Sequence, residues 1–244
     1  MGHGRQAPSA VDHEQIYRTQ PESYDRLVAR EDYQGNLARA LTDLMPSSGA
    51  VIVDLGTGTG RLARLLARGQ RIIASDRSLA MLQVASRRTV AGLANVNYLA
   101  ADNRWVPLRG ASADVVLAGW TLGHSVSWYG ETWPVEIGRA LGEMMRVVRQ
   151  PGLLVIVETL GTGIEAPRAP TQGLADYYRW LEETHGFERR WLRTDYRFET
   201  PEEAVSLIRF FFGDDLAGRV ASEGGTLVPE CTGLWLRSLT AAQT

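Results

Sequence analysis

The residues best suited to chemistry are an aspartate and three glycines that follow a short apolar run near residue 50. The run VIVDLGTGTGRL places Asp54 two residues before Gly56, and Gly58, Gly60 and Arg61 come after it. A dinucleotide loop needs the spacing G-x-G-x-x-G. Here the third glycine comes one residue early, and the carboxylate of Asp54 would repel a pyrophosphate. The pattern therefore favours a ligand that carries an amine, although a tight turn without a ligand would have the same glycines.

Two later apolar runs also end at acidic residues. Asp76 closes the run RIIASD about 20 residues beyond the glycines, at the separation expected of an acid that accepts hydrogen bonds from ribose hydroxyls. Capping of the following helix is the structural alternative for Asp76. Asp102 and Asn103 follow the next run, and an ordinary surface turn would use the same residue types.

The fourth apolar run, residues 113–118, leads into Trp120 and His124. Open α/β sheets bind ligands at the carboxyl edge of their strands, so we expect acceptor chemistry here. Histidine titrates near neutral pH and suits a general base, but a hydrogen-bonding structural role is the alternative. Trp128 and Tyr177 would add aromatic surface for an apolar, aromatic or cationic ligand, although Tyr177 is equally consistent with a core position.

The elements that position these residues alternate along the chain. Short apolar runs predict strands at 50–54, 71–76, 96–100, 113–118 and 153–160, with helices near 61–68, 79–89 and 135–148. Nearly continuous apolar strands separated by helices predict a doubly wound α/β fold with a parallel sheet covered on both faces. One or two helices are expected within 14–44. Helices near 174–185, 201–212 and 214–223 and strands at 188–198 and 226–237 are expected after residue 160.

The run D-L-G-T-G-T-G-R-L resembles the first motif of class I S-adenosylmethionine (SAM)-dependent methyltransferases, and the chain is similar to their quinone-biosynthesis-like, small-molecule group over roughly residues 20–160. The resemblance implies one Rossmann-like domain with seven strands in the order 3-2-1-4-5-7-6 and the last strand antiparallel. Residues 1–48 would form a helical cap, 49–160 the cofactor-binding core, and 161–244 an acceptor-side segment that completes the sheet.

The resemblance also assigns site residues. Asp76 would hold the ribose, Asp102 the adenine amino group, and Met81 would pack on adenine or belong to the core. Tyr24 would close over the cofactor, or dock its helix on the domain. The expected cofactor-binding residues are Tyr24, Asp54, Gly56, Thr57, Gly58, Gly60, Asp76, Arg77, Met81, Asp102, Asn103 and Trp120. The expected acceptor-binding residues are Trp120, His124, Trp128 and Tyr177, with His124 catalytic and S-adenosylhomocysteine as the product.

Composition excludes several kinds of chemistry. The formal charge is -2 and every one of the 26 basic residues is arginine, so Schiff-base catalysis, a Walker-A lysine and a lysine base are impossible. The single cysteine, Cys231, rules out an iron–sulfur cluster, and the scattered histidines indicate no metal site. Nucleic acid is not an expected partner, since no basic tract occurs and Ala-Gly-Trp-Thr follows the fourth strand where DNA amino-methyltransferases have (N/D)-P-P-(Y/F).

No signal peptide and no apolar run of about 20 residues is present, so we expect a soluble cytoplasmic protein without a membrane partner. The expected function is methyl transfer from SAM to a small-molecule acceptor. A SAM-binding protein without catalysis, acting as a sensor or partner subunit, remains the alternative. An NAD(P)-dependent oxidoreductase is disfavoured by the glycine spacing and the absence of lysine. The sequence identifies neither the acceptor, the methylated element nor the oligomeric state.

Overall fold

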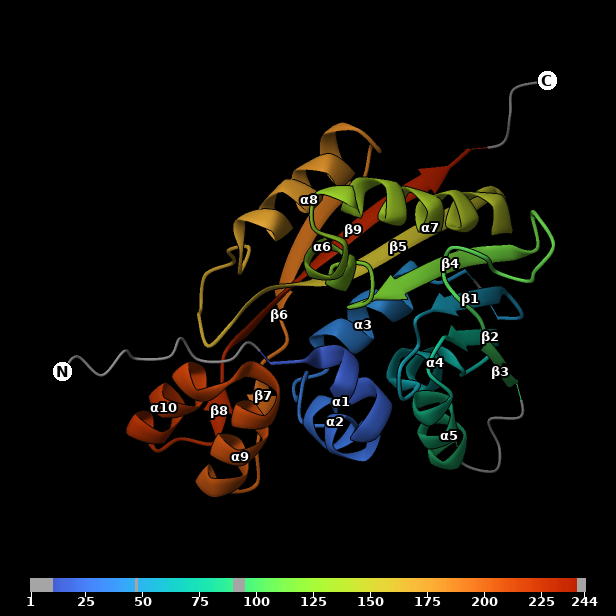
Figure 1. Cartoon of the computed structure of the whole chain (residues 1–244). Coiled ribbons are helices and arrows are strands. Elements are labelled where there is room, and N and C mark those ends of the chain that lie inside the picture. Colours follow the sequence, from blue (N-terminus) through green and yellow to red (C-terminus); the bar gives the residue numbers. More distant parts are fainter. Residues whose placement is uncertain (1–10, 47, 90–94, 241–244) are drawn as a thin grey trace.

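A mixed seven-stranded sheet forms the centre of the molecule (Figure 1). The computed structural model describes residues 11–46, 48–89 and 95–240. The strands of these residues are β1 Val51–Leu55, β2 Arg71–Asp76, β3 Val96–Ala100, β4 Ala113–Gly119, β5 Val148–Thr162, β6 Glu188–Arg193, β7 Tyr196–Arg197, β8 Leu227–Val228 and β9 Glu230–Leu239. The helices are α1 His13–Thr19, α2 Pro21–Val28, α3 Asn36–Leu44, α4 Arg61–Leu66, α5 Leu79–Arg88, α6 His124–Tyr129, the 3-10 turn η1 Gly130–Thr132, α7 Trp133–Val147, α8 Gln172–Glu183, α9 Pro201–Phe212 and α10 Asp214–Glu223.

The strand order is β3-β2-β1-β4-β5-β9-β6. The five strands β1 to β5 pair in parallel, whereas β9 runs antiparallel to both of its neighbours, β5 and β6. With β9 as the seventh strand of the sheet, the order 3-2-1-4-5-7-6 and the antiparallel last strand predicted from the sequence are confirmed. The order reverses direction at β1 and β4, so the carboxyl ends of these two strands flank a switch point at which such sheets bind ligands.

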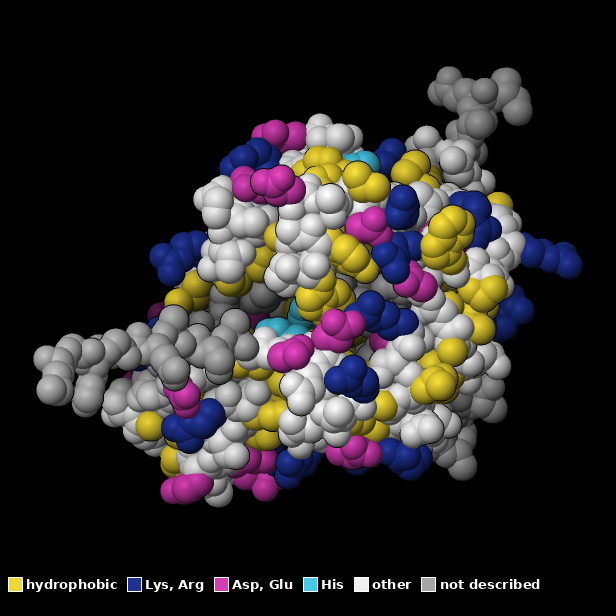
Figure 2. Space-filling model, in the orientation of Figure 1, with side chains coloured by type: hydrophobic (Ala, Val, Ile, Leu, Met, Phe, Trp, Pro, Cys, Tyr) yellow, Lys and Arg dark blue, Asp and Glu magenta, His cyan; other side chains and the backbone are white. Residues whose placement is uncertain are grey.

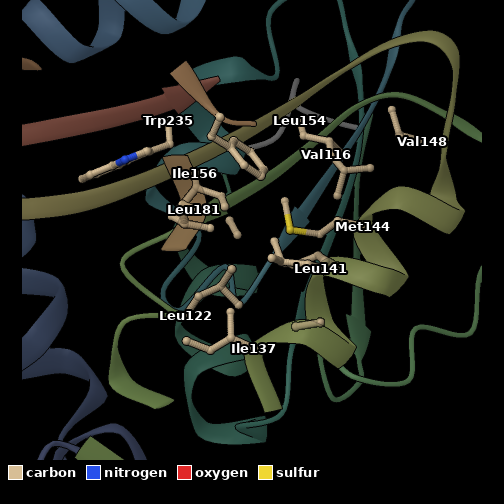
Figure 3. Packing of buried hydrophobic residues seen from close by; sticks show 14 of the residues in the cluster. Val116, Leu122, Ile137, Leu141, Met144, Val148, Leu154, Ile156, Leu181 and Trp235 are labelled. Atoms are coloured by element: carbon tan, nitrogen blue, oxygen red, sulfur yellow. The ribbon is translucent and has the colours of Figure 1, made fainter. Parts of the chain in front are cut away.

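Alternating side chains on the central strands feed two separate hydrophobic layers. Val116 and Ile156 face the layer that α7 and α8 cover, and Met144 of α7 packs toward them (Figure 3). Their neighbours in sequence, Val115 and Val155, face the opposite layer with α3 and α4. A strand presents successive residues to opposite faces, which explains why strands that are apolar throughout are buried on both sides.

The C-terminal region departs from the sequence-based expectation. The strand predicted over 188–198 is two strands, because only β6 joins the large sheet while β7 pairs with β8 in a separate two-stranded sheet. These short strands and helices α9 and α10 share their own core, and Leu27 of α2 belongs to it. The segment between β6 and β9 is thus packed on the N-terminal helices (Figure 1).

Three helices, α1, α2 and α3, occupy the region where one or two were expected. Only Gln20 separates α1 from α2. Asp12 caps the start of α1, and Pro21 opens α2, at the first helical position that proline favours. Both helices contact α5. On the face shown in Figure 2, acidic and basic side chains are interspersed. Among the described residues, no helix is long and apolar enough to cross a bilayer.

Candidate active site

A cavity of about 630 Å³ lies where β1, β2 and β4 end, a volume typical of small-molecule sites. Most of the residues predicted for ligand binding line it. These are Tyr24, Asp54, Gly56, Thr57, Gly58, Asp76, Arg77, Met81, Asp102, Asn103, Trp120, His124 and Trp128. Gly60 and Tyr177, which were also predicted, do not line it.

Asp54 is the second-last residue of β1. One of its carboxylate oxygens accepts a hydrogen bond from a described residue, and the other does not. The Thr57 hydroxyl donates to its Oδ2 at 2.6 Å, while Oδ1 is buried and accepts no hydrogen bond in the described part of the chain. Burial raises the pKa of Asp54 to about 7, against the opposing effect of the Thr57 hydrogen bond. A buried, unpartnered acceptor is costly, so this oxygen is suited to a ligand donor such as an amine.

Gly56 and Gly60 both have a positive φ, but a side chain would meet different parts of the molecule at the two positions. Gly56 has φ +67°, and a Cβ there would lie 2.1 Å from Oγ1 of Thr121, so any side chain would clash across the cavity wall. Gly60, with φ +78°, precedes α4, and a Cβ there would lie 2.8 Å from the Tyr98 hydroxyl. The structure thus places Gly60 in the packing between the loop and β3, outside the cavity.

Asp76 at the end of β2 organises the glycine loop. Its Oδ2 accepts the Gly58 N–H at 2.9 Å and its Oδ1 accepts the Ser78 N–H at 2.8 Å. Helix α5 is capped by the Ser78 side chain, which accepts from the amide of Met81. The residue that caps this helix is therefore Ser78 and not Asp76, so the structural alternative for Asp76 is wrong. Two of the roughly four acceptor positions of the carboxylate remain for a ligand.

The residues after β3 form the opposite wall of the cavity. Both carboxylate oxygens of Asp102 accept from Arg104, at 2.7 to 2.9 Å, and these bonds lower the pKa of Asp102. The side-chain amide of Asn103 donates to Thr121 at 3.3 Å. Met81 is 2% exposed, so it is a core residue whose surface also reaches the cavity.

Side chains of α1 and α2 cover the cavity. Arg77 forms an ion pair with Glu14 of α1 at 2.7 Å, and its guanidinium lies 4.7 Å from the centre of the Trp128 ring. Tyr24 of α2 approaches the glycine loop, since a Cβ on Gly58 would lie 3.7 Å from its ring. Burial raises the pKa of Tyr24 above 10, so its hydroxyl is neutral. The cover is held by charge pairing and aromatic contact.

His124 begins α6 and is paired with a tyrosine that the sequence did not point to. Its Nε2 lies 2.7 Å from the Tyr17 hydroxyl, a hydrogen bond whose donor depends on the histidine tautomer. The Trp128 ring stacks on it at 5.1 Å, and His13 lies 5.5 Å away. Burial, together with His13 and Arg77, lowers the pKa of His124 to about 3. The histidine is therefore neutral near pH 7. The prediction from residue type, that His124 titrates near neutral pH, is wrong because the side chain is buried.

Trp120 follows β4 with φ +48°, a left-handed conformation that is rare for a bulky residue and frequent at functional sites. Its backbone N–H donates to the Val157 carbonyl at 2.7 Å. The Arg61 guanidinium lies 5.2 Å from the centre of its ring and forms an ion pair with buried Glu31 at 2.6 Å. Arg61, which follows the glycine loop, thus contacts the Trp120 ring. The glycine spacing had identified Arg61 only as the residue at the position where a dinucleotide loop has its third glycine.

Tyr177 is buried in the core beside α7, in edge contact with Trp133. The expectation that it contacts the acceptor came from aromatic spacing on a helix, which does not distinguish a cavity from a core. Here α8 turns that side toward the sheet, and Tyr178 bonds the Thr159 carbonyl at 2.7 Å. The hydroxyl of Tyr177 has no partner within the described residues.

Glu158 near the end of β5 supports the loop that carries Trp120 and His124. Its carboxylate is 4% exposed and accepts the Gly123 N–H at 2.8 Å. Burial raises the pKa of Glu158 to about 8, and the amides of Gly123 and Leu122 oppose that shift. It therefore holds the start of α6 from the side away from the cavity.

Glu158→Gln should change how stability depends on pH. Between pH 5 and pH 8 the folded chain keeps a proton on Glu158 that the unfolded chain has lost, so wild-type stability should fall as pH rises, by about 1 kcal/mol per unit from this group. Urea denaturation at several pH values should show a smaller decline for Glu158→Gln. The exposed Glu131→Gln variant is the control and should follow the wild type. Equal slopes for all three proteins would contradict the assignment.

Several side chains of the site could not be found from spacing. Tyr17 and His13 of α1, and Phe211 of α9, approach His124 or one another as a ring cluster. They lie far from β4 in sequence, and no motif connects them to it. The aromatic and histidine content before residue 20 was the only available signal. Among the described residues, no group of three or more His, Cys, Asp or Glu could hold a metal ion.

Comparison with known proteins adds independent observations. Residues 53–156 match the family Methyltransf_11, described as methyltransferase domain. Malonyl-[acyl-carrier protein] O-methyltransferase of Marinomonas sp. (strain MWYL1) is 34% identical over 148 residues, 58% of this chain and 49% of that protein. Demethylmenaquinone methyltransferase of Thermobifida fusca is 34% identical over 133 residues, 54% of this chain and 52% of that protein. The chain thus spans about half the length of these curated relatives.

Solved structures share the fold at low sequence identity. A SAM-dependent methyltransferase from Aquifex aeolicus has a TM-score of 0.55 at 18% identity, covering 90% of this chain and 98% of that one. Phosphoethanolamine N-methyltransferase 2 of Haemonchus contortus, in complex with S-adenosyl-L-methionine, has a TM-score of 0.56 at 16% identity, covering 94% of this chain and 61% of that one. The likeness extends well beyond residues 53–156.

Proposed function

We propose that this chain transfers the methyl group of SAM to a small-molecule acceptor, because residues 53–156 match the methyltransferase-domain family and curated methyltransferases are 34% identical to parts of the chain. This match supports the resemblance drawn from the glycine-rich loop. The product would be S-adenosylhomocysteine. The buried single cysteine, Cys231, is consistent with action in the reducing cytoplasm.

The observation that carries the proposal is the convergence of Asp54, the glycine loop and Asp76 on one cavity. The residues present fit SAM. Asp54 lines the cavity and its Oδ1 has no partner among the described residues, so we assign it to the ammonium of the methionyl part, which would favour the charged form of that carboxyl. Gly56 and Gly58 leave room along the loop. Asp76 has acceptor positions left for the ribose hydroxyls, and Asp102 faces the same cavity from the opposite wall.

SAM supplies a methyl group on a sulfonium sulfur, which is already activated for displacement. The chain therefore contributes chiefly alignment and exclusion of water. Trp120, Trp128 and Tyr24 provide aromatic walls that favour a cation by attraction to the ring faces. The Arg77–Glu14 ion pair ties the cover to the cavity, so α1 and α2 limit access of water.

We propose that the acceptor binds beside Trp120, His124 and Trp128, at the end of β4. The two relatives compared above are named for acting on a malonyl-[acyl-carrier protein], at oxygen, and on demethylmenaquinone. Neither is a nucleic-acid base, which supports an acceptor of another class. His124, neutral and beside this space, is the side chain we propose to take a proton from an acceptor that retains one.

Calorimetry tests the choice of cofactor. We expect S-adenosylhomocysteine to bind with micromolar affinity and NAD(H) to give no measurable heat, because Asp54 and the early third glycine oppose a pyrophosphate. Tighter binding of NAD(H) would overturn the proposal. A panel of carboxylate, hydroxyl and quinone acceptors, assayed for S-adenosylhomocysteine release, then separates an enzyme from a SAM-binding protein without catalysis. The second outcome is micromolar binding with no turnover on any acceptor.

A further inference from the structure

A second cavity, of about 310 Å³, lies beside the first and is walled mainly by arginine. Its charged lining residues are Asp25, Arg26, Arg30, Arg61, Arg64 and Arg88. They come from α2 and the turn after it, from the start of α4, and from the end of α5. Val28 and Arg61 line both cavities, so the two spaces share a wall.

The acids that pair with these arginines mostly lie outside the second cavity. Arg30 bonds Glu199 and Glu203 at 2.7 Å, and Arg61 bonds Glu31 at 2.6 Å. None of these three glutamates lines the cavity. Arg30 donates to these glutamates from Nε and Nη2 and Arg61 donates from Nη1, so each guanidinium keeps N–H groups that these bonds do not use.

Asp25 is the one acid in the lining, and it is 4% exposed. It accepts the Nε–H of Arg88 at 2.7 Å, whereas Nη2 of Arg64 lies 3.7 Å away, beyond hydrogen-bond distance. Arg26 is exposed, and within the described chain its side chain bonds only the Ser23 hydroxyl, at 3.3 Å. Five arginines and four carboxylates, those of Asp25, Glu31, Glu199 and Glu203, thus meet around the cavity, and Arg26 is the lining arginine without an acidic partner among the described residues.

We propose that this cavity binds the phosphoryl group of a small-molecule ligand. A guanidinium presents N–H donors in a planar fork that matches phosphate oxygens, and a phosphoryl dianion offers oxygens in several directions to several arginines at once. Because Arg61 borders both cavities, this group belongs either to the methyl acceptor itself or to a separate phosphorylated molecule bound next to it. The acceptor alternative rests on the proposed function, whereas the anion site does not.

Titration calorimetry with pyrophosphate at low ionic strength tests the site. Arg26→Gln should weaken binding about tenfold and Arg26→Gln/Arg88→Gln about 100-fold, the equivalent of one charge-assisted hydrogen bond for each arginine. Arg87→Gln is the matched control, because Arg87 neighbours Arg88 on α5, is similarly exposed, pairs with Glu22 and does not line the cavity. We expect its affinity to stay within twofold of the wild type.

Binding that is equal in the wild type and the double variant, or absent from the wild type, would overturn the anion site. If loss of the Asp25 partner unfolds the double variant, the exposed Arg26→Gln variant decides alone. Affinity for S-adenosylhomocysteine should be unchanged in all variants. A failure of cofactor binding would therefore be recognised separately from a failure of the anion site.

Kinetics then distinguishes the two sources of the phosphoryl group. Pyrophosphate that raises the KM of the acceptor in the wild type, but not in Arg26→Gln, would place the acceptor's own phosphoryl group in the second cavity. Pyrophosphate that leaves this KM unchanged would assign the cavity to a separate ligand.

Discussion

Asp76→Ala should weaken binding of S-adenosylhomocysteine by about 2–3 kcal/mol, roughly 30- to 150-fold, since charge-assisted hydrogen bonds contribute about 1.5–3 kcal/mol each and water recovers part of the loss. The carboxylate holds the Gly58 and Ser78 amides, and we propose that its two remaining acceptor positions bind the ribose hydroxyls. Removing it therefore loosens the glycine loop in addition to deleting the ligand contacts. Calorimetry gives the affinity directly.

Asp76→Asn separates the two contributions. Its amide oxygen can still accept one backbone N–H, so the loop should stay closer to its wild-type form while the charge is lost, and the affinity should be intermediate. Both variants should stay folded at room temperature, and the melting temperature of Asp76→Asn should lie closer to the wild-type value than that of Asp76→Ala, which frees both backbone amides. If Asp76→Ala unfolds while its folded fraction keeps full affinity, Asp76 serves only to hold the loop.

The central sheet could be predicted because each strand carries its own signal. The runs at β1 and β4 are apolar except for Asp54 and Asp114, and burial on both faces is the physical reason. The small β7–β8 sheet carries no such signal, since each of its strands has two residues and forms only by pairing across about 30 intervening residues. Its core depends on Leu27 of α2, a contact that local patterning cannot reveal.

The site divides in the same way. Asp54, Gly56 and Asp76 sit at strand ends, so parallel topology brings them to one edge whatever the rest of the chain does. The Tyr17–His124 hydrogen bond joins α1 to α6, and the Glu31–Arg61 ion pair joins the segment after α2 to α4, at sequence separations of 107 and 30 residues. Residue type alone also predicted the wrong titration range for His124, because burial lowers the pKa of its imidazole.

His124→Gln should lower turnover by about 10²-fold, the low end of the usual range for general acid–base catalysis, because a base with a pKa near 3 has little affinity for a proton. Its affinity for S-adenosylhomocysteine should change little. Since His124 is unprotonated throughout the physiological range, turnover should show no rise through a histidine-like pKa between pH 5 and pH 8. Steady-state rates of S-adenosylhomocysteine release across this range measure both effects.

Tyr17→Phe and His185→Gln make this test specific. Tyr17→Phe removes the hydrogen bond to His124 but keeps the imidazole, so a smaller loss of turnover than in His124→Gln indicates proton transfer to the histidine. Equal losses in both variants would mean that the pair acts only by holding α1 over the cavity. His185 packs on Trp180, away from the cavity, and its substitution should leave turnover unchanged. A His124→Gln enzyme within tenfold of wild-type turnover would reject the base assignment, and methyl transfer would then depend mainly on alignment.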